Sequence, residues 1–157
     1  MMEISFRIAT KNDQDFIRQL AARVFSIFGH YDEILTDWFL HPGVITVIGS
    51  KNGESAAFAM LQLGEKETWN DSIGELLAIA VIPEHQRQGV GRTLLNYMED
   101  LALRFRLRGI HLHTGKDNLP AQYLFEKAGY RVAGKEKSYY PEGQSAVRMV
   151  KMLGQNQ

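Results

Sequence analysis

The stretch Glu75-Leu-Leu-Ala-Ile-Ala-Val-Ile-Pro-Glu-His-Gln-Arg-Gln-Gly-Val-Gly-Arg-Thr-Leu-Leu95 constrains how the rest of the chain can fold. Residues 76–82 are apolar without interruption and Pro83 follows them, which predicts a central strand covered on both faces. Apolar residues then recur with helical spacing over 94–105, which predicts a long amphipathic helix. The stretch therefore predicts a buried strand, a sharp loop and a helix start.

Two glycines, Gly89 and Gly91, lie in the loop between this strand and this helix. Backbone N–H groups at a helix start are unpaired, the helix dipole is positive there, and glycine allows a phosphate to approach closely. A dinucleotide-binding loop would carry a third glycine where Leu94 stands, and the Gly-Lys-Ser/Thr ending of a Walker loop is absent. The loop therefore favours a polyphosphate ligand of another kind.

The other segments alternate between strand-like and helix-like patterns. Thr10 and Asn12 are candidate caps for the first helix, and the Lys51-Asn-Gly53 turn predicts a hairpin. A polar loop is expected over 64–72 and a frayed tail over 154–157. Strands are expected over 4–8, 44–49, 56–63, 76–82, 110–114, 130–135 and 146–153, and helices over 16–25, 31–40, 94–105 and 118–129.

The composition favours a single globular domain over residues 1–157. The 18 basic residues balance the 18 acidic ones, which argues against nucleic acid or an anionic membrane as a partner. No signal-peptide pattern or membrane-length apolar run occurs, so a cytoplasmic location is expected. Cysteine is absent, which excludes disulfides, thiolate metal sites and a cysteine nucleophile.

Two motifs resemble those of the GNAT superfamily of N-acetyltransferases. The loop sequence Gln86-x-x-Gly89-x-Gly91 resembles the family signature Q/R-x-x-G-x-G/A, and it follows a buried strand. A second motif resembles N-x-x-A-x-x-L/F-Y-x-x-x-G-F; it reads Asn118-x-x-Ala121-x-x-Leu124-Phe125-x-x-x-Gly129-Tyr130. The resemblance covers roughly residues 4–153, and within the family it is similar to the protein N-terminal acetyltransferases of the ribosomal-protein-alanine type.

The resemblance implies an α/β (α+β) fold with a mixed, mostly antiparallel sheet of about seven strands, flanked by about four helices. The central strand would separate from the strand bearing His113, and acetyl-CoA would bind at that separation as co-substrate, without a metal. Its pyrophosphate would lie on the N–H groups of 87–92, its pantetheine arm beside 79–81, and its thioester oxygen near the Val81 N–H. Asn118 would bind pantetheine while capping its helix. The implied cofactor-binding residues are Ile79, Ala80, Val81, Arg87, Gln88, Gly89, Val90, Gly91, Arg92, Asn118 and Phe125.

Two side chains are candidates for the base that takes a proton from the acceptor amine. His113 and Glu75 fall where different branches of the family carry a catalytic base, and each could act alone or through water. Each could also be structural, as a strand histidine or a solvated acid. His111 and His113 could suggest a metal pair, but no third ligand with suitable spacing is evident, so no metal site is expected.

The chain departs from the family where a tyrosine acid is expected, because that position is Phe125. Tyr130, Tyr139 or Tyr140 could reach the leaving thiol, but water or no acid is favoured, since a thiol of pKa about 8.5 leaves passably as thiolate.

The expected function is direct acetyl transfer from acetyl-CoA to a primary amine, either a protein N-terminus or a small molecule. The alternatives are a catalytically idle CoA-binding module and an enzyme for another acyl-CoA. Loops 28–41 and 136–145 are expected to define the acceptor site. A homodimer, common in the family, remains an open expectation.

Overall fold

We describe a computed structural model that covers residues 3–64 and 72–154. The loop expected over 64–72 and the tail expected over 154–157 lie almost wholly outside the described residues. The order of strands and helices expected from the sequence is confirmed, and boundaries shift by a few residues. The strands are β1 (Ile4–Ile8), β2 (Val44–Lys51), β3 (Glu54–Gln62), β4 (Ile73–Val81), β5 (Gly109–Gly115), β6 (Arg131–Glu136) and β7 (Ala146–Met152). The helices are α1 (Gln14–Phe25), α2 (Tyr31–Phe39), α3 (Val90–Arg104) and α4 (Leu119–Lys127).

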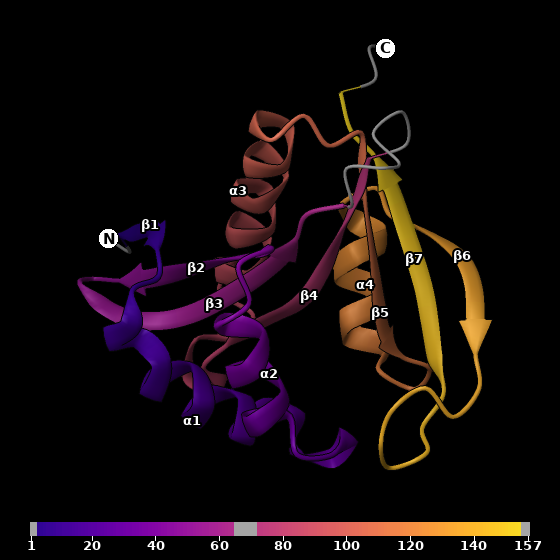
Figure 1. Cartoon of the computed structure of the whole chain (residues 1–157), viewed down its shortest axis with the longest axis horizontal. Coiled ribbons are helices and arrows are strands. Elements are labelled where there is room, and N and C mark those ends of the chain that lie inside the picture. The colour runs from indigo at the N-terminus through magenta and orange to yellow at the C-terminus, as the bar shows by residue number, and fades with distance from the viewer. Residues whose placement is uncertain (1–2, 65–71, 155–157) are drawn as a thin grey trace.

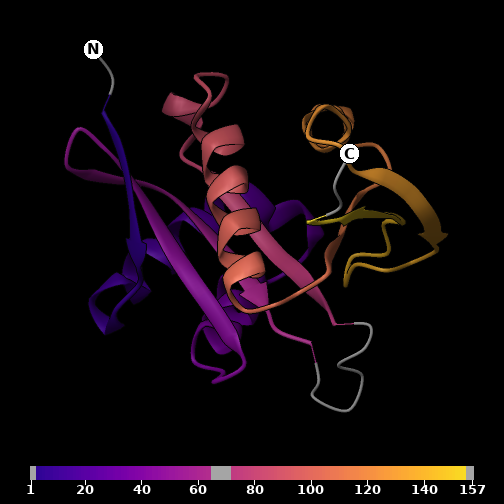
Figure 2. The same cartoon turned by 90° about the horizontal axis from the view of Figure 1, so that it is seen from above.

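All described strands join one mixed sheet in the order β1-β2-β3-β4-β5-β7-β6. Every neighbouring pair is antiparallel except β4 and β5, which are parallel. Helices α1 and α2 cover one face, and α3 and α4 lie on the other (Figure 1). Seen from above, α3 lies over the N-terminal strands and α4 beside the C-terminal ones (Figure 2). The fold class predicted from the sequence is confirmed.

Strands β4 and β5 separate halfway along their length. Their pairing runs only from Ile73 opposite Gly109 to Leu76 opposite Leu112, while β4 continues to Val81 alongside β3. Leu77 forms a bulge at this point, since Met60 pairs with Ala78 and the adjacent Leu61 with Leu76. A bulge bends its strand and interrupts pairing, so it accounts for the divergence visible in Figure 1.

Burial along β4 alternates, which corrects the expectation of a strand buried on both faces. Leu76, Ala78 and Ala80 are buried, whereas Leu77, Ile79 and Val81 are only partly so. The reason is the separation from β5, because the side chains and backbone along this length of β4 border an open cavity. The unbroken apolar run of residues 76–82 therefore belongs to a strand that lines a cavity, and not to one that is covered on both faces.

Local sequence signals set several element boundaries. Thr10 forms a capping box with Asp13, as expected for a cap, but the turn that it caps is a short 3-10 helix preceding α1. Asn12 caps nothing; its N–H donates to the Thr10 hydroxyl. Asn52 and Gly53 adopt positive φ in the expected hairpin turn. None of the described helices is long and apolar enough to cross a membrane.

Candidate active site

A cavity of about 910 Å³ occupies the separation between β4 and β5. One end is bordered by the loop that precedes α3, and the other by α1, α2 and the loop between β6 and β7. Helix α4 supplies a side wall. The lining includes most of the residues that the sequence singled out: Glu75, Ile79, Ala80, Val81, Arg87, Gly89, Gly91, Arg92, His113, Asn118 and Phe125.

The loop before α3 has the geometry of an anion site. Arg87 and Gly89 both have positive φ, at 65° and 85°, and backbone turns of this kind direct N–H groups into a concave surface. Within the described chain, no hydrogen bond is donated by the N–H groups of Arg87, Gln88 or Gly89. Since α3 begins at Val90, the positive end of its dipole adds to the attraction for an anion.

Side chains of this loop divide between structural and exposed positions. The Gln86 amide donates to the Val81 carbonyl over 3.0 Å and so fastens the loop to the end of β4. Gln88 accepts a hydrogen bond from Lys51 and is absent from the cavity lining. Val90 is 1% exposed and is absent from the cavity lining as well. Arg87 and Arg92 line the cavity and supply positive charge there.

Helix α4 contributes one polar and one apolar group to the wall. The Asn118 side chain accepts from the Ala121 N–H over 3.3 Å, which confirms its role as the helix cap. Phe125 lines the cavity and is 4% exposed. Its ring packs edge-on against Tyr130, whose pKa burial raises and which is absent from the cavity lining.

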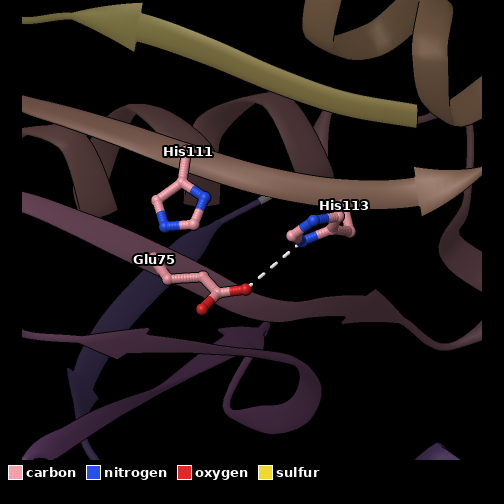
Figure 3. A group of neighbouring side chains, drawn as sticks. All are labelled: Glu75, His111 and His113. Atoms are coloured by element: carbon pink, nitrogen blue, oxygen red, sulfur yellow. Dashed lines mark ion pairs between the residues drawn. The ribbon is translucent and has the colours of Figure 1, made fainter. Parts of the chain in front are cut away.

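Three ionisable side chains converge beside the cavity from β4 and β5 (Figure 3). Glu75 is the register partner of His111 on β5, so both project from the same face, and His113 lies two residues farther along that face. His113 Nδ1 lies 3.4 Å from a Glu75 carboxylate oxygen. The sequence indicated no third ligand for the histidine pair. That expectation was wrong, because the parallel register brings Glu75 alongside them.

Glu136, at the end of β6, determines which nitrogen of His113 can accept a proton. Its carboxylate contacts His113 Nε2. A carboxylate can only accept a hydrogen bond, so in the neutral form of the ring Nε2 carries the proton and Nδ1 presents its lone pair toward Glu75. Burial is the main cause lowering the pKa of neighbouring His111, with the positive charge of Arg148 adding to it and Glu75 opposing it.

The two loops expected to define the acceptor site meet at this end of the cavity. Tyr139 stacks on His113 with ring centroids 4.3 Å apart, and Tyr140 packs on Phe28 at the same separation. The Gln144 amide donates to the Ile27 carbonyl and fastens the β6–β7 loop to the segment before α2. Burial, with Glu75 adding to it, raises the pKa of Tyr139 to about 12, so its phenol stays neutral at physiological pH.

Some site residues could not have been found in the sequence. Glu136 lies far from His113 in the chain, and only the sheet order brings the two together. Tyr31 and Trp38 fall within residues 28–41, which were expected to define the acceptor site, and both line the cavity. The acidic residues of α2 do not line this cavity; they border a separate depression, which is lined by Arg18, Asp32, Glu33, Thr36 and Asp37.

Comparisons with known proteins agree with this geometry. The family model "Acetyltransferase (GNAT) family" matches residues 14–130. A relative named ribosomal protein bS18-alanine N-acetyltransferase, from Escherichia coli K12, is 35% identical over 92 residues, which span 59% of this chain and 58% of that protein.

Two solved structures share the fold. The ribosomal-protein-S18-alanine N-acetyltransferase from Escherichia coli has a TM-score of 0.82 at 23% identity, with 99% of this chain and 97% of that one covered. Arabidopsis thaliana NAA60, in complex with acetyl-CoA, has a TM-score of 0.82 at 15% identity, with 96% and 99% covered. The family match spans most of the described sheet and both sequence motifs, and the chain belongs to the GNAT acetyltransferase family.

Proposed function

We propose that the protein transfers an acetyl group directly from acetyl-CoA to a primary amine, and that protein N-termini are its acceptors. The observation that carries this proposal is one cavity between the separated strands β4 and β5. It connects the N-terminal end of α3, which has the geometry of an anion site, with the His113–Glu75 pair. The first end suits a nucleotide pyrophosphate, and the second suits an amine that must lose a proton.

In this proposal the pyrophosphate binds the free N–H groups of the loop 87–92, with Arg87 and Arg92 adding charge. The pantetheine arm lies along Ile79 to Val81, where β4 has no partner on the β5 side and offers unpaired backbone groups. Asn118 contributes from the start of α4 while capping it. The thioester then lies near the Val81 N–H and the Phe125 ring.

The reaction forms one bond and breaks one. The amine nitrogen attacks the thioester carbonyl carbon, an N–C bond forms, and the C–S bond breaks to release CoA as a thiolate. The excess proton of the nitrogen passes to His113 Nδ1 or to the Glu75 carboxylate, directly or through water. These two acceptor atoms are 3.4 Å apart, so a single N–H group can reach either one. The thiolate takes its proton from water.

The acceptor end of the cavity supports a peptide N-terminus. Its wall combines Tyr139, Tyr140 and Phe28 with two carboxylates, Glu75 and Glu136, so it offers aromatic surface beside negative charge. An ammonium group on a peptide chain fits both features. The name of the bS18-alanine relative, which is 35% identical over 92 residues, supports the same acceptor class.

We also propose a domain organisation and a cellular location for the enzyme. We propose one catalytic domain, because the sheet is built from strands near both ends of the chain. A zero net charge supports action on peptides in the cytoplasm and gives no support to a nucleic-acid or membrane partner.

The test is thiol release from acetyl-CoA, read with a thiol-reactive dye, across peptides with varied N-termini, lysine peptides, polyamines and aminoglycosides. The chain has no cysteine and contributes no background. Release with peptides bearing a free α-amine, and not with N-terminally blocked ones, is expected. Tight acetyl-CoA binding without release for any amine would overturn the proposal.

Variants of the two candidate bases complete this test. Glu75→Gln and His113→Gln are each expected to lower kcat by about 10²-fold or more, since a positioned base contributes roughly 10²–10⁴. The matched control His41→Gln changes a histidine outside the cavity lining and should leave kcat within about twofold. If both site variants keep the parent kcat, neither side chain is the base.

A further inference from the structure

The cluster of Glu75, His111 and His113 has the composition of a transition-metal site. Its three potential ligand atoms, one from each residue, all lie within 4.8 Å of one another. They project from the paired ends of two adjacent strands, so the backbone holds them on rigid elements (Figure 3). Two imidazoles and one carboxylate form a donor set that Zn²⁺, Co²⁺ and Ni²⁺ favour over Mg²⁺ or Ca²⁺.

Each of the two histidines has one buried ring nitrogen without a partner. Among the described residues, neither His111 Nδ1 nor His113 Nδ1 has a hydrogen bond, although both atoms are inaccessible to solvent. A buried polar atom without a hydrogen-bond partner loses its hydration without compensation and calls for an explanation. A ligand that accepts these lone pairs would remove that cost.

Glu136 prepares His113 for metal coordination in the way that outer carboxylates do. Its contact with Nε2 fixes the proton on that nitrogen and leaves Nδ1 as the donor. That lone pair faces a Glu75 oxygen 3.4 Å away, where two electron-rich atoms repel each other unless a cation or a proton lies between them.

The spacing fits a small ion after a modest adjustment. Donor atoms around a tetrahedral Zn²⁺ with bonds of about 2.0–2.2 Å are separated by about 3.3–3.6 Å. The pair formed by His113 and Glu75 already has this spacing. The full group, within 4.8 Å, needs side-chain movements of roughly one ångström. The carboxylates of Glu75 and Glu136 lie at the cluster, and Arg148 is a positive charge that acts on His111.

We propose that Glu75, His111 and His113 bind one divalent transition-metal ion, Zn²⁺ being the best fit, and that the bound ion inhibits the enzyme. The ion would be an inhibitor and not a cofactor, because it occupies the two atoms proposed to accept the proton of the amine. The binding part stands on this geometry alone, whereas the inhibition part rests on the proposed function.

Binding is tested with Co²⁺ on the purified chain, without acetyl-CoA or acceptor. Visible absorption of the bound ion reports its coordination, and equilibrium dialysis reports its stoichiometry. One Co²⁺ per chain is expected, displaced by Zn²⁺. His111→Gln should weaken binding by at least about tenfold, since even indirect partners of a metal ligand are worth 10–100-fold. His41→Gln is the matched control and should bind as the parent does.

Inhibition is tested separately, as the ratio of rates with and without Zn²⁺ within each variant. The acetylated product is measured by mass spectrometry, because the thiol of released CoA itself binds zinc. The parent and His41→Gln should be inhibited and His111→Gln resistant, with circular dichroism verifying that each is folded.

The possible results separate the two parts of the proposal. Absence of Co²⁺ binding by the parent, or equal binding by folded His111→Gln, would overturn the metal site whatever the activity. Specific Co²⁺ binding without inhibition would keep the site and contradict the proposed role of Glu75 and His113 as proton acceptors.

Discussion

Phe125 occupies the position where the family motif carries a tyrosine, and the cavity explains how the site accommodates the exchange. The ring is nearly fully buried, packs on Tyr130 and lines the space proposed for the thioester. No hydroxyl is supplied from this position, and Tyr130 does not border the cavity. Tyr139 and Tyr140 do border it, but at the acceptor end. This arrangement agrees with the proposal that the thiol leaves as thiolate without a protein acid.

Phe125→Tyr is predicted to leave kcat unchanged or to raise it by up to about tenfold, because a phenol facing the thioester can protonate the leaving sulfur. Steady-state kinetics with saturating acetyl-CoA measure the effect. Thermal unfolding should show a loss of no more than about 1–3 kcal/mol from burial of the hydroxyl. A large fall in kcat in a stably folded variant would mean that Phe125 shapes the thioester pocket.

At the scale of single residues, the sequence predicted on which face of a strand a side chain lies better than it predicted which residues that side chain contacts. The strand expected over 110–114 correctly put His111 and His113 on one face, whereas the parallel register that brings Glu75 alongside them was not expected. The contact with Glu136 and the stacking of Tyr139 depend on loop and edge-strand positions that no local pattern encodes. Interactions between distant segments are decided by the sheet order, which periodicity does not reveal.

The loop between β4 and α3 is the element on which cofactor binding depends, and its two glycines have different roles. Gly89 has φ of 85°, and a Cβ added there would meet nothing within 4 Å, so it would project into the open phosphate site. A Cβ on Gly91 would lie at ordinary contact distance from Val81 and Leu124. Only the first glycine is required by backbone conformation.

Gly89→Ala is predicted to weaken acetyl-CoA binding by about tenfold or more and to destabilise the fold by about 1 kcal/mol, because alanine is strained at positive φ. Gly91→Ala is the matched control and should bind acetyl-CoA as the parent does, with stability unchanged or raised by about 0.5–1 kcal/mol. Calorimetric titration and thermal unfolding give both quantities. Equal affinities for the two variants would contradict the proposed position of the pyrophosphate.

The junction between β1 and α1 is held by a charged contact that predicts a pH dependence of stability. Arg7 donates two hydrogen bonds to the Asp13 carboxylate, at 2.7 and 2.8 Å, and the Thr10 N–H donates a third. Hydrogen bonding from Arg7 is the main cause that lowers the pKa of Asp13. The carboxylate therefore stabilises the fold above its unfolded pKa of about 3.9, and this contribution is lost as pH falls through the lower folded value.

Asp13→Asn should reduce the free energy of unfolding by about 1–2 kcal/mol at pH 7. This value is at the lower end of the range for hydrogen bonds to charged groups, because Arg7 is half exposed and solvent screens its charge. The difference should shrink as pH falls below the unfolded pKa of about 3.9 and through the lower folded pKa of Asp13. Asp15→Asn is the control, since its exposed pair with Arg18 should contribute at most about 0.5 kcal/mol. Urea unfolding across this pH range measures both; a constant difference for Asp13→Asn would contradict the account.

The helices and strands themselves were largely predictable, because each has a strong periodic pattern or a clear cap. Asn118, Pro120 and Gly129 bound α4, and Asn52-Gly53 fixes the hairpin. The bulge at Leu77 was not predictable, since nothing in an apolar run distinguishes the extra residue. As a consequence, β4 has alternating buried and partly buried residues, whereas burial on both faces was expected.

The whole molecule is organised by the separation of β4 from β5. One half of the sheet carries the anion-binding loop, the other carries His113 and α4, and the cavity forms between them. The family resemblance predicted this separation, whereas the unbroken hydrophobicity of residues 76–82 pointed away from it. The acceptor end is lined by Phe28 on one side and by Tyr139 and Tyr140 on the other, and the Phe28–Tyr140 ring contact joins the two sides. In the proposed function, the two substrates bind in this cavity, between the separated strands β4 and β5.

The most direct test of this account is a single-turnover reaction in which excess enzyme, acetyl-CoA and a peptide with N-terminal alanine and an internal lysine are mixed. Fragmentation mass spectrometry then locates the acetyl group, which separates transfer from simple thioester hydrolysis, a distinction that thiol release cannot make. The account predicts one acetyl group on the α-amine, formed in step with CoA and greatly slowed in Glu75→Gln and His113→Gln. CoA released without acetylated peptide, or no turnover by an enzyme that binds acetyl-CoA tightly, would contradict it.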